Sequence, residues 1–468
     1  MLLLGRIVAA LISGALLAQA YSLSPFWPLA WLAPIPVLIA VIGASRAGAL
    51  AYGAIAGVVS MALMASYFME IGGIAPVLVV TLAKALIWGG MALAVRGAAR
   101  LLPAFAAVFV FPALMAGIET LIAASSPHGS AGSLAYSQMD FIPAIQVASI
   151  GGAPAITFVM TLFASSIAFL IVKRAFAAAL APVATVASAL AFGVLRPPLP
   201  VTVAANEPPR FFLATLIAGD QFDGIPMDWR AVWNAYAPQI ERAADDGRRV
   251  VVLPEKIAHL PPGDRAAAIE QLAEIARRRG ILIVAGADDE TEEGRFNRAF
   301  VFTPDNWESY DKRHMIPGFE SHFNLGIGPL TFEHEGVRYG VAICKDMDFP
   351  ALGREYAGVD VMLVPAWDFT SDAWLHSRMA MLRGVESGYA IARSARDGVM
   401  TVSDAYGRVL QDAPSGPQTA YNVSIPTSAA VPTVYSRIGD AFGWSMLALA
   451  ALLIGWTIWA RRRAGQGD

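Results

Sequence analysis

"VAICKDMDFP", residues 341–350, contains the only cysteine of this 468-residue chain. The apolar run Val341-Ala342-Ile343 is typical of a buried strand, and Cys344 follows it directly. A thiol at a strand end is held at the edge where layered α/β folds place their chemistry, so Cys344 is a candidate nucleophile. A lone cysteine is also common as an inert core residue, and the rest of the chain has to distinguish these two roles.

The charged residues are distributed very unevenly along the chain. Residues 1–209 hold 12 of them, residues 210–440 hold 55, and residues 441–468 hold four. The whole chain is 56% hydrophobic and 15% charged, against about 25% charged residues in average soluble proteins. A membrane block is therefore expected before a soluble domain. The net charge of −3 gives no global basic field of the kind that attracts nucleic acid, so no nucleic-acid partner is expected.

Eight apolar runs are about 20 residues long, the length that crosses a bilayer. Seven are expected as transmembrane helices of a membrane domain over residues 1–200, and they lie at roughly 5–20, 28–44, 48–68, 74–95, 103–124, 143–172 and 175–195. The eighth, 441–460, is expected as a C-terminal transmembrane helix after a soluble domain over 210–430. The first run ends in Ala18-Gln19-Ala20, which resembles a signal-peptidase site, so removal of residues 1–20 stays open.

Lysine and arginine are concentrated in alternate loops between these runs. These residues are Arg6, Arg46, Arg96, Arg100, Lys173, Arg174 and Arg461 to Arg463. The opposite loops carry Glu70, His128 and Asp140 instead, and Arg196 is the one exception to the pattern. By the positive-inside rule, both termini are predicted in the cytoplasm and the soluble domain outside it.

The soluble domain alternates between strand-like and helical patterns. The strand-like runs are 211–217, 249–253, 281–285, 298–303, 338–343, 360–364, 389–394 and 399–403, and the helical patterns are 228–246, 264–279 and 374–387. In the second helical pattern Ile269, Leu272 and Ile275 lie on one apolar stripe, and Gly280 ends the helix. Strands that alternate with helices predict an α/β or layered α+β domain.

Three polar residues lie at or just after strand ends of this domain. Glu255 follows "VVVLP", Lys312 lies in "YDKRHMIP", and Cys344 follows "GVAI". A thiol that attacks a carbonyl needs a base to take its proton and a donor for the oxyanion that forms. A carboxylate and an ammonium supply those two roles. Glutamate and lysine at strand ends are also common as solvated surface residues, so residue types alone leave both interpretations open.

The order and spacing of these segments resemble the Glu-Lys-Cys triad of the nitrilase superfamily, with 57 residues from Glu255 to Lys312 and 32 from there to Cys344. "SLSPFWPLAWLAPIPVLIA" (22–40) and "LAYSQMDFIPAIQVASIGGAPAITFVMTLF" (134–163) are similar to the membrane half of bacterial apolipoprotein N-acyltransferases. "SDAWLHSRMAMLRGVESG" (371–388) is similar to their soluble half. The resemblance implies a polytopic α-helical membrane domain joined to an α/β nitrilase-like domain, an α-β-β-α sandwich.

This resemblance also implies an acyltransferase that works through a thioester. Glu255 would be the general base and Cys344 the nucleophile, while Lys312 and a main-chain N–H near Lys345 would hold the oxyanion. The acyl donor would be a phospholipid, and the acceptor would be the N-terminal amine of a diacylglyceryl-modified lipoprotein. The resemblance implies no cofactor. It implies a monomer in the bacterial cytoplasmic (inner) membrane, with the catalytic domain on the periplasmic side.

Four further residues match supporting positions of the family. Glu320 matches a second glutamate near the active site, and Asn297 matches an asparagine in the strand before the lysine. Trp367 and Trp374 fall where the family has mobile, lipid-facing loop aromatics. A strand-edge amide would equally explain Asn297, and ordinary core packing would explain the two tryptophans.

The chain departs from the family next to the nucleophile. Lys345 and Asp346 stand where the family usually has tyrosine and glutamate, and Leu253 replaces a tryptophan that commonly precedes the "PE" segment. Lys345 could lower the thiol pKa, contact a phosphate head group, or simply pair with Asp346 or Asp348. Because these surroundings are altered while the triad is intact, the sequence supports acyl-enzyme chemistry better than it supports the acceptor.

Three alternative functions stay open at this point. One is a membrane-bound amidase with the same triad, and another is an acyltransferase with a different amine acceptor. The third is a lipid-binding or scaffold protein with a dead site, against which the intact triad argues. His314 and His376 have no further ligand at a useful spacing, so no metal site is expected.

Overall fold

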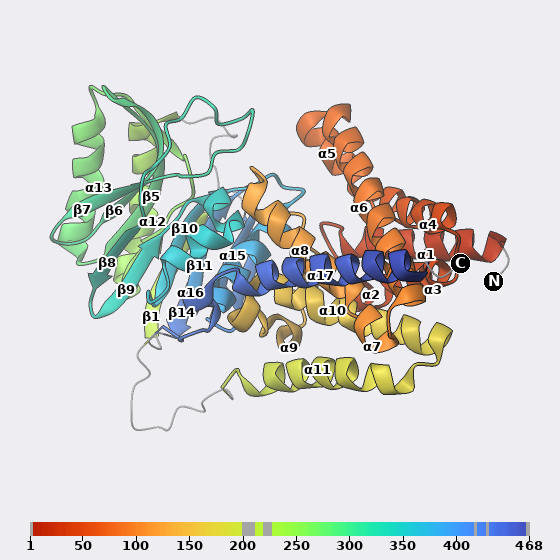
Figure 1. Cartoon of the computed structure of the whole chain (residues 1–468). Coiled ribbons are helices and arrows are strands. Elements are labelled where there is room, and N and C mark those ends of the chain that lie inside the picture. The colour runs from red at the N-terminus through yellow and green to blue at the C-terminus, as the bar shows by residue number, and fades with distance from the viewer. Residues whose placement is uncertain (1–2, 199–210, 219–226, 416–418, 427–429, 465–468) are drawn as a thin grey trace. The chain divides into compact units, whose positions relative to one another are not determined.

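The computed structural model describes residues 3–198, 211–218, 227–415, 419–426 and 430–464 of the chain (Figure 1). The chain forms two compact units. The helical unit comprises Met1–Ala124, Gly132–Pro197 and Ile438–Asp468, and the sheet unit comprises Ser125–Ala131 and Pro198–Arg437. The expected division into an apolar helical part and an α/β part is therefore observed, with the last apolar segment returning to the helical unit.

The helical unit consists of helices joined by short connections. They are α1 (Leu3–Ala20), α2 (Trp27–Leu32), α3 (Pro34–Ile42), α4 (Arg46–Val59), α5 (Ala65–Gly72), α6 (Ile74–Leu101), α7 (Ala104–Ala107), α8 (Val110–Ser125), the 3-10 helix η1 (Leu134–Gln138), α9 (Ile142–Ile145), α10 (Ala148–Lys173), α11 (Phe176–Leu195) and α17 (Ala441–Ala464). Mean hydropathy is high along the long helices, as an apolar solvent requires.

Six stretches of the described residues are long and apolar enough to cross a membrane. They are Leu3–Ala20, Ile74–Leu101, Ala104–Ser125, Ala148–Lys173, Phe176–Leu195 and Ala441–Arg463. These match six of the eight expected runs. The runs expected at 28–44 and 48–68 form shorter apolar helices, Trp27–Ile42 and Arg46–Val59, the first of which is interrupted at Ala33. The number of crossings therefore stays a prediction.

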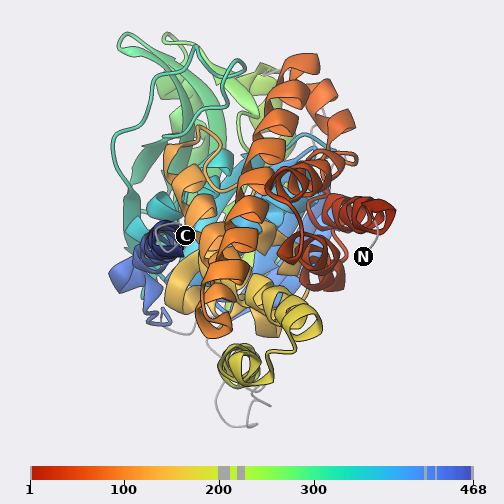
Figure 2. The ribbon, with the colours of Figure 1, turned by 45° about the vertical axis from the view of Figure 1, so that its right-hand side comes forward.

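Two glycines of α4 allow this helix to pack closely against α6 (Figure 1, Figure 2). A Cβ atom on Gly53 would lie 2.4 Å from the carbonyl oxygen of Trp88, and one on Gly57 would lie 2.4 Å from that of Lys84. No side chain can approach a carbonyl so closely. The two glycines are four residues apart and share one helix face, the arrangement that lets membrane helices approach backbone to backbone.

The sheet unit contains two sheets. Its strands are β1 (Phe211–Ala218), β2 (Met227–Asp228), β3 (Val250–Val252), β4 (Ala258–Leu260), β5 (Leu282–Thr291), β6 (Gly294–Phe302), β7 (Trp307–Asp311), β8 (Leu330–His334), β9 (Val337–Val341), β10 (Val361–Trp367), β11 (Ala390–Arg396), β12 (Val399–Ser403), β13 (Val409–Pro414) and β14 (Thr419–Pro426). One sheet has the order β14-β1-β3-β5-β4-β2, with β6 joining β5 to β7, and the other has the order β13-β12-β11-β10-β9-β8. Strands β1, β3 and β5 are parallel, as are β9, β10 and β11.

Helices of the same unit cover the outer faces of the two sheets. They are α12 (Trp229–Asp245) and α13 (Arg265–Arg279) on the larger sheet, and α14 (Pro350–Glu355) and α15 (Ala373–Ser387) with the 3-10 helix η2 (Cys344–Asp348) on the smaller one. A short helix, α16 (Tyr435–Ile438), lies near the end of the unit.

Side chains that alternate along each strand separate the layers. Val250 and Val252 belong to the apolar core between the sheets, whereas Val251 packs with α12 and α13. Leu363 faces the same inner core, and its neighbour Met362 faces the helices of the smaller sheet. Each sheet therefore packs on the other sheet with one face and on helices with the other face. The resulting four layers confirm the expected α-β-β-α sandwich.

All eight strand-like runs overlap strands, and the three helical patterns are α12, α13 and α15. The analysis of the sequence missed six strands, namely β2, β4, β7, β8, β13 and β14. Five of them lie at sheet edges and β4 is only three residues long. Edge strands carry many polar residues because one side faces water, so their hydrophobic pattern is weak.

Candidate active site

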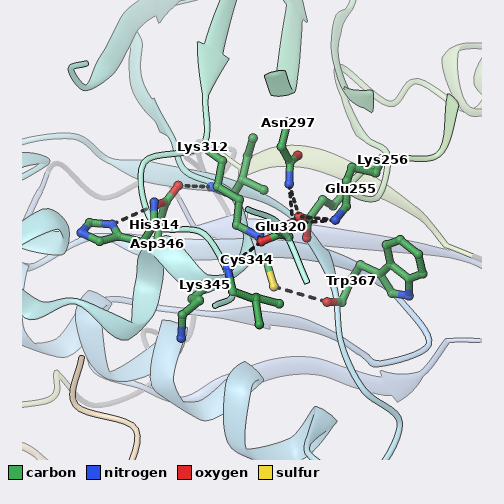
Figure 3. Close-up of polar contacts among 12 residues, drawn as sticks. Glu255, Lys256, Asn297, Lys312, His314, Glu320, Cys344, Lys345, Asp346 and Trp367 are labelled. Atoms are coloured by element: carbon green, nitrogen blue, oxygen red, sulfur yellow. Dashed lines mark hydrogen bonds and ion pairs between the residues drawn. The ribbon is translucent and has the colours of Figure 1, made fainter. Parts of the chain in front are cut away.

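Cys344 lies at the turn where the chain passes from β9 into η2 (Figure 3). Its φ of +44° is in the left-handed region, which is costly for a non-glycine residue and is characteristic of strained functional turns. The thiol is 7% exposed, and Sγ lies 3.4 Å from the carbonyl oxygen of Trp367 at the end of β10. The turn therefore ends the strand and holds the thiol in a buried position between two parallel strands.

Glu255 comes after β3 and is completely buried. Its Oε1 accepts hydrogen bonds from Asn297 Nδ2 at 2.6 Å and from Lys312 Nζ at 2.9 Å. Its Oε2 is buried without a hydrogen-bond partner in the described part of the chain. One oxygen therefore anchors the carboxylate while the other is left able to accept a proton.

Lys312 follows β7, and its main-chain N–H donates to the carbonyl oxygen of Asn297 on β6 at 2.9 Å. Its ammonium is fully buried and also donates to Glu320 Oε2 at 2.8 Å. Burial alone would lower the pKa of Lys312, but the charges of Glu255 and Glu320 outweigh it and raise the pKa well above its usual value. Lys312 is therefore a fixed cation at every physiological pH.

Glu320 is held by three donors besides Lys312. Lys256 Nζ donates to its Oε1 at 2.5 Å, Asn297 Nδ2 donates to the same oxygen at 3.0 Å, and the Ile316 N–H donates to Oε2 at 2.9 Å. Burial would raise the pKa of Glu320, but the two lysines lower it below the usual range, so this carboxylate is ionised. The structure thus brings the predicted residues Glu320 and Asn297 into one network with Glu255 and Lys312 (Figure 3).

The electrostatic surroundings keep the Cys344 thiol protonated at rest. Burial raises its pKa well above the usual value, and the negative charge of Glu255 adds to this, while Lys312 acts in the opposite direction. A protonated thiol near a carboxylate whose second oxygen has no partner among the described residues is the arrangement that general-base activation requires. Attack would move the thiol proton to Glu255 rather than start from a preformed thiolate.

Asp346 joins the turn of Cys344 to the segment of Lys312. Its carboxylate is fully buried and accepts hydrogen bonds from the Tyr310 hydroxyl at 2.8 Å and from the His314 N–H at 2.8 Å. It also accepts from the N–H groups of Arg313 at 3.1 Å and Ile343 at 3.2 Å. These bonds fix Lys312 and Cys344 relative to each other, so Asp346 is a positioning residue of the site.

Lys345 is buried, and its ammonium points away from the Glu255–Lys312 network (Figure 3). Its Nζ lies 3.4 Å from Asp348 Oδ2 and 3.4 Å from His128 Nδ1. Pairing with Asp348, one of the possibilities that the sequence leaves open, is observed, and contact with a phosphate head group stays a prediction. The partner His128 comes from the segment Ser125–Ala131, which belongs to the sheet unit although it lies between α8 and η1 in the sequence.

The two tryptophans occupy different environments. The Trp367 ring lies against the Arg396 guanidinium at 3.8 Å, its Nε1 donates to Asp397 at 2.9 Å, and Lys256 Nζ lies 5.0 Å from the ring centre, so this ring lies next to the charged network. Trp374 is half-buried in the first turn of α15, under Arg378. Within the described ranges no hydrogen bond or ion pair joins Trp374 to the residues around Cys344, and its expected role at the lipid surface stays a prediction.

Reasoning from the sequence missed two contributions. Lys256 directly follows Glu255 in the sequence but was given no role, and Asp346 was noted only as a departure from the family and as a possible partner of Lys345. A cation directly after the candidate base was a usable signal for Lys256. Neither contact could be derived from spacing, because Lys256 meets Glu320 across 64 residues and Asp346 meets Tyr310 across 36.

Two family models match the chain. The model for the apolipoprotein N-acyltransferase N-terminal domain matches residues 13–166, and the carbon-nitrogen hydrolase model matches residues 215–433. The first match lies in the helical unit apart from the short segment Ser125–Ala131, and the second lies in the sheet unit.

Curated relatives include apolipoprotein N-acyltransferases of several bacteria. That of Geobacter metallireducens is 26% identical over 95% of this chain and 94% of its own, and that of Bradyrhizobium diazoefficiens is 27% identical over 68% and 67%. An (R)-stereoselective amidase from a Pseudomonas species is 29% identical over 31% of this chain and 58% of its own. Among solved structures, a CN-hydrolase superfamily protein from Xanthomonas campestris covers 51% of this chain and 97% of its own, at 22% identity and a TM-score of 0.42.

The amidase relative matches less than a third of this chain, whereas the Geobacter relative matches nearly all of it. The two family models lie in the same order as the two parts expected from the sequence, and between them they cover most of the chain. The chain belongs to the apolipoprotein N-acyltransferase family, within the nitrilase superfamily.

Proposed function

We propose that this protein moves an acyl chain from a phospholipid to the N-terminal amine of a diacylglyceryl-modified lipoprotein, through a thioester on Cys344. The observation that carries the proposal is the arrangement of Glu255. Asn297 and Lys312 hold one carboxylate oxygen, while the other is buried and has no partner among the described residues. The charge of Glu255 also acts on the thiol, so a buried carboxylate is available as the base for the nucleophile.

In the first step, Glu255 takes the thiol proton as Sγ attacks the carbonyl carbon of the phospholipid ester. The oxyanion that forms is stabilised by the Lys312 ammonium and by a main-chain N–H near Lys345. Collapse of this intermediate breaks the carbon–oxygen bond of the ester. The leaving oxygen receives the proton from Glu255, which yields a lysophospholipid and an acyl thioester on Cys344.

In the second step, the free amine of the lipoprotein attacks the thioester carbonyl. Glu255 accepts a proton from the attacking nitrogen, the carbon–sulfur bond breaks, and the proton returns to the thiol. The products are the N-acylated lipoprotein and the resting enzyme, so the cycle needs no cofactor. Both substrates are membrane lipids, which agrees with a catalytic sheet unit on the same chain as six apolar helices of spanning length.

The same proposal includes a location. The alternation of Lys and Arg in the loops supports both termini in the cytoplasm and the sheet unit on the periplasmic side of the bacterial inner membrane. The proposal also takes the protein to act as a monomer, as the resemblance to the family implies. A map of cysteine accessibility on a Cys344→Ala background, with single cysteines introduced at exposed sheet-unit positions such as Glu333, tests the orientation. Labelling of that position only after the membrane is permeabilised would contradict it.

The chemical proposal is tested on the purified full chain in detergent. With phosphatidylethanolamine alone, intact-mass spectrometry should detect one added acyl chain on the parent protein and none on Cys344→Ala. Addition of a diacylglyceryl-cysteine lipopeptide should then remove the acyl chain and give the N-acylated peptide. Complementation of a strain depleted of its own N-acyltransferase, scored by the acylation of lipoprotein N-termini, tests the acceptor in cells.

Each alternative corresponds to a different outcome of the same experiment. Release of free fatty acid at the same rate with and without lipopeptide would mean that water is the acceptor, as in a hydrolase. Transfer to other amines but not to the lipopeptide would mean a different acceptor. Equal acylation of the parent and of Cys344→Ala would exclude Cys344 as the nucleophile.

A further inference from the structure

Four charged side chains, Glu255, Glu320, Lys312 and Lys256, meet in the network near Cys344, and the last of them is not part of the predicted site. Lys256 Nζ lies 2.5 Å from Glu320 Oε1 and 3.8 Å from Glu255 Oε1. Lys312 Nζ contacts the same two carboxylates, at 2.8 Å and 2.9 Å. Each oxygen of Glu320 is therefore held by a different lysine, and the network has two carboxylates and two ammonium groups (Figure 3).

Lys256 is built firmly into this position. Its φ of +48° is left-handed, and its carbonyl oxygen accepts a hydrogen bond from the buried Arg396 at 3.0 Å. Its ammonium lies 5.0 Å from the ring centre of Trp367 and 5.4 Å from that of Phe323, and the residue is 9% exposed. A strained backbone and a desolvated ammonium both cost free energy, so the surrounding contacts must compensate for both costs to keep Lys256 in this position.

The charge of Lys256 determines the net charge of the network near the thiol. With it, the formal charges of Glu255, Glu320, Lys312 and Lys256 sum to zero. Without it, the network would carry one net negative charge, which opposes the formation of a second anion on sulfur or on the tetrahedral oxyanion.

We propose that Lys256 is a positioning residue that neutralises and holds Glu320, and thereby lowers the pH at which Cys344 becomes reactive. Lys256 touches neither the sulfur nor the scissile bond in this proposal, and it acts through Glu320. The inference rests on the proposed role of Cys344 as nucleophile but not on the acyl donor or acceptor.

The other charged groups around Cys344 are engaged with partners of their own. Asp368, whose charge also acts on the thiol, pairs with Arg393 at 3.0 Å. Lys345 on the nucleophile's own turn pairs with Asp348. Asp346 accepts from Tyr310 and from main-chain N–H groups, and it faces the opposite side of the turn. Replacement of Lys256 alone therefore unbalances the network without removing any of these pairs.

The test measures the rate of Cys344 alkylation by iodoacetamide against pH on the full chain in detergent. This rate reports the thiolate directly and does not depend on any lipid substrate. Lys256→Met should raise the midpoint of the profile by about one pH unit, which lowers alkylation about tenfold at a pH below the midpoint. Lys256→Arg keeps the charge and should restore the parental midpoint.

A double substitution distinguishes charge from shape. Glu320→Gln alone removes a negative charge and should shift the midpoint downward. Lys256→Met combined with Glu320→Gln again gives a network with no net charge, and its midpoint should return toward that of the parent. An additive role in packing would instead make the double variant at least as impaired as Lys256→Met.

Arg313→Gln is the matched control, because it also removes one cation next to a network residue. The Arg313 guanidinium pairs with Glu355 at the surface, at 2.7 Å, and its variant should keep the parental midpoint. An unchanged midpoint in Lys256→Met would overturn the inference, as would an equal shift in Arg313→Gln. If the midpoints behave as expected but no acyl chain is transferred, the proposed function fails while this inference stands.

Discussion

The Lys345 ammonium lies 3.4 Å from the Asp348 carboxylate, within the same short helix that carries Cys344. The ammonium that follows Cys344 in the sequence therefore pairs within the turn rather than with the sulfur. His128 approaches the same ammonium from a segment more than 200 residues earlier. Side chains of consecutive residues diverge at a strand end, which explains how a lysine next to a cysteine can contact neither its sulfur nor the carboxylates of Glu255 and Glu320.

Lys345→Met should leave the pH midpoint of Cys344 alkylation unchanged, in contrast to Lys256→Met. It should lower the free energy of unfolding by about 1–3 kcal/mol, because Asp348 loses one of its buried partners. Alkylation profiles and thermal unfolding of the full chain in detergent measure the two effects. A midpoint shift as large as that of Lys256→Met would mean that the Lys345 charge reaches the thiol.

Glu255→Gln should reduce the rate of acyl-enzyme formation by about 10²–10⁴, the usual contribution of a general base. Glutamine can still accept from Asn297 and Lys312, so the site should remain assembled. Single-turnover acylation with phosphatidylethanolamine measures the change. Gln271→Ala on the exposed side of α13 is a suitable control and should acylate at the parental rate.

Lys312→Met should lower the acylation rate by at least about 10²–10³, the cost of losing one oxyanion donor. It should also destabilise the sheet unit by about 3–5 kcal/mol, because Glu255 and Glu320 lose a buried counter-charge. The two consequences are separated by measuring acylation well below the lowered melting temperature. Parental acylation in a folded Lys312→Met protein would remove the lysine from the proposed mechanism.

His376 should make stability depend on pH. Its two ring nitrogens lie 3.3 Å from Asp348 and 3.2 Å from Asp372. Burial would lower the pKa of His376, but the two carboxylates outweigh it and raise the pKa well above the usual value. A pKa that is higher in the folded state stabilises fully below the unfolded value of about 6.5 and is lost as pH rises through the folded value.

His376→Gln should therefore lower Tm most at about pH 6, and the difference from the parent should narrow in strongly alkaline buffer. Thermal unfolding of both proteins from about pH 6 to 10 measures this gap. The exposed His322 provides a control, since His322→Gln should change Tm little at any pH in the series. A gap that stays constant with pH would show that the His376 charge is not what stabilises the fold.

Gly57→Leu should prevent close packing of α4 on α6, because even a Cβ at Gly57 would lie 2.4 Å from the Lys84 carbonyl oxygen. The expected result is a large loss of folded protein after detergent extraction, measured by size-exclusion chromatography. Gly90→Ala on α6 is the matched control, since a Cβ there meets no atom within 4 Å. Equal yields of the two variants would contradict the packing role of the glycines.

Apart from the α-β-β-α layer order, which the resemblance to the family implied, the sequence by itself determined the mixture of strands and helices in the sheet unit and the apolar helical character of the rest. Both follow from local patterns, namely alternating apolar residues along strands and charge-poor runs of about 20 residues. The positions of Glu255, Lys312 and Cys344 at strand ends were also local features. The sequence did not predict the edge strands β7 and β8, or the break at Ala33, because polar edges and a proline inside an apolar run give weak or conflicting signals.

Only the tertiary structure decided which charges meet. Lys256 contacts Glu320, and Lys345 contacts Asp348 and His128. Asp346 connects the segment that follows Lys312 to the turn of Cys344. These contacts join residues that are far apart in the chain or that diverge although adjacent. Their geometry depends on the packing of strand ends from two different sheets and on two left-handed residues, Cys344 and Lys256, that packing holds in place. Local sequence patterns specify which element a residue belongs to, whereas the pairing of buried charges depends on how the elements pack.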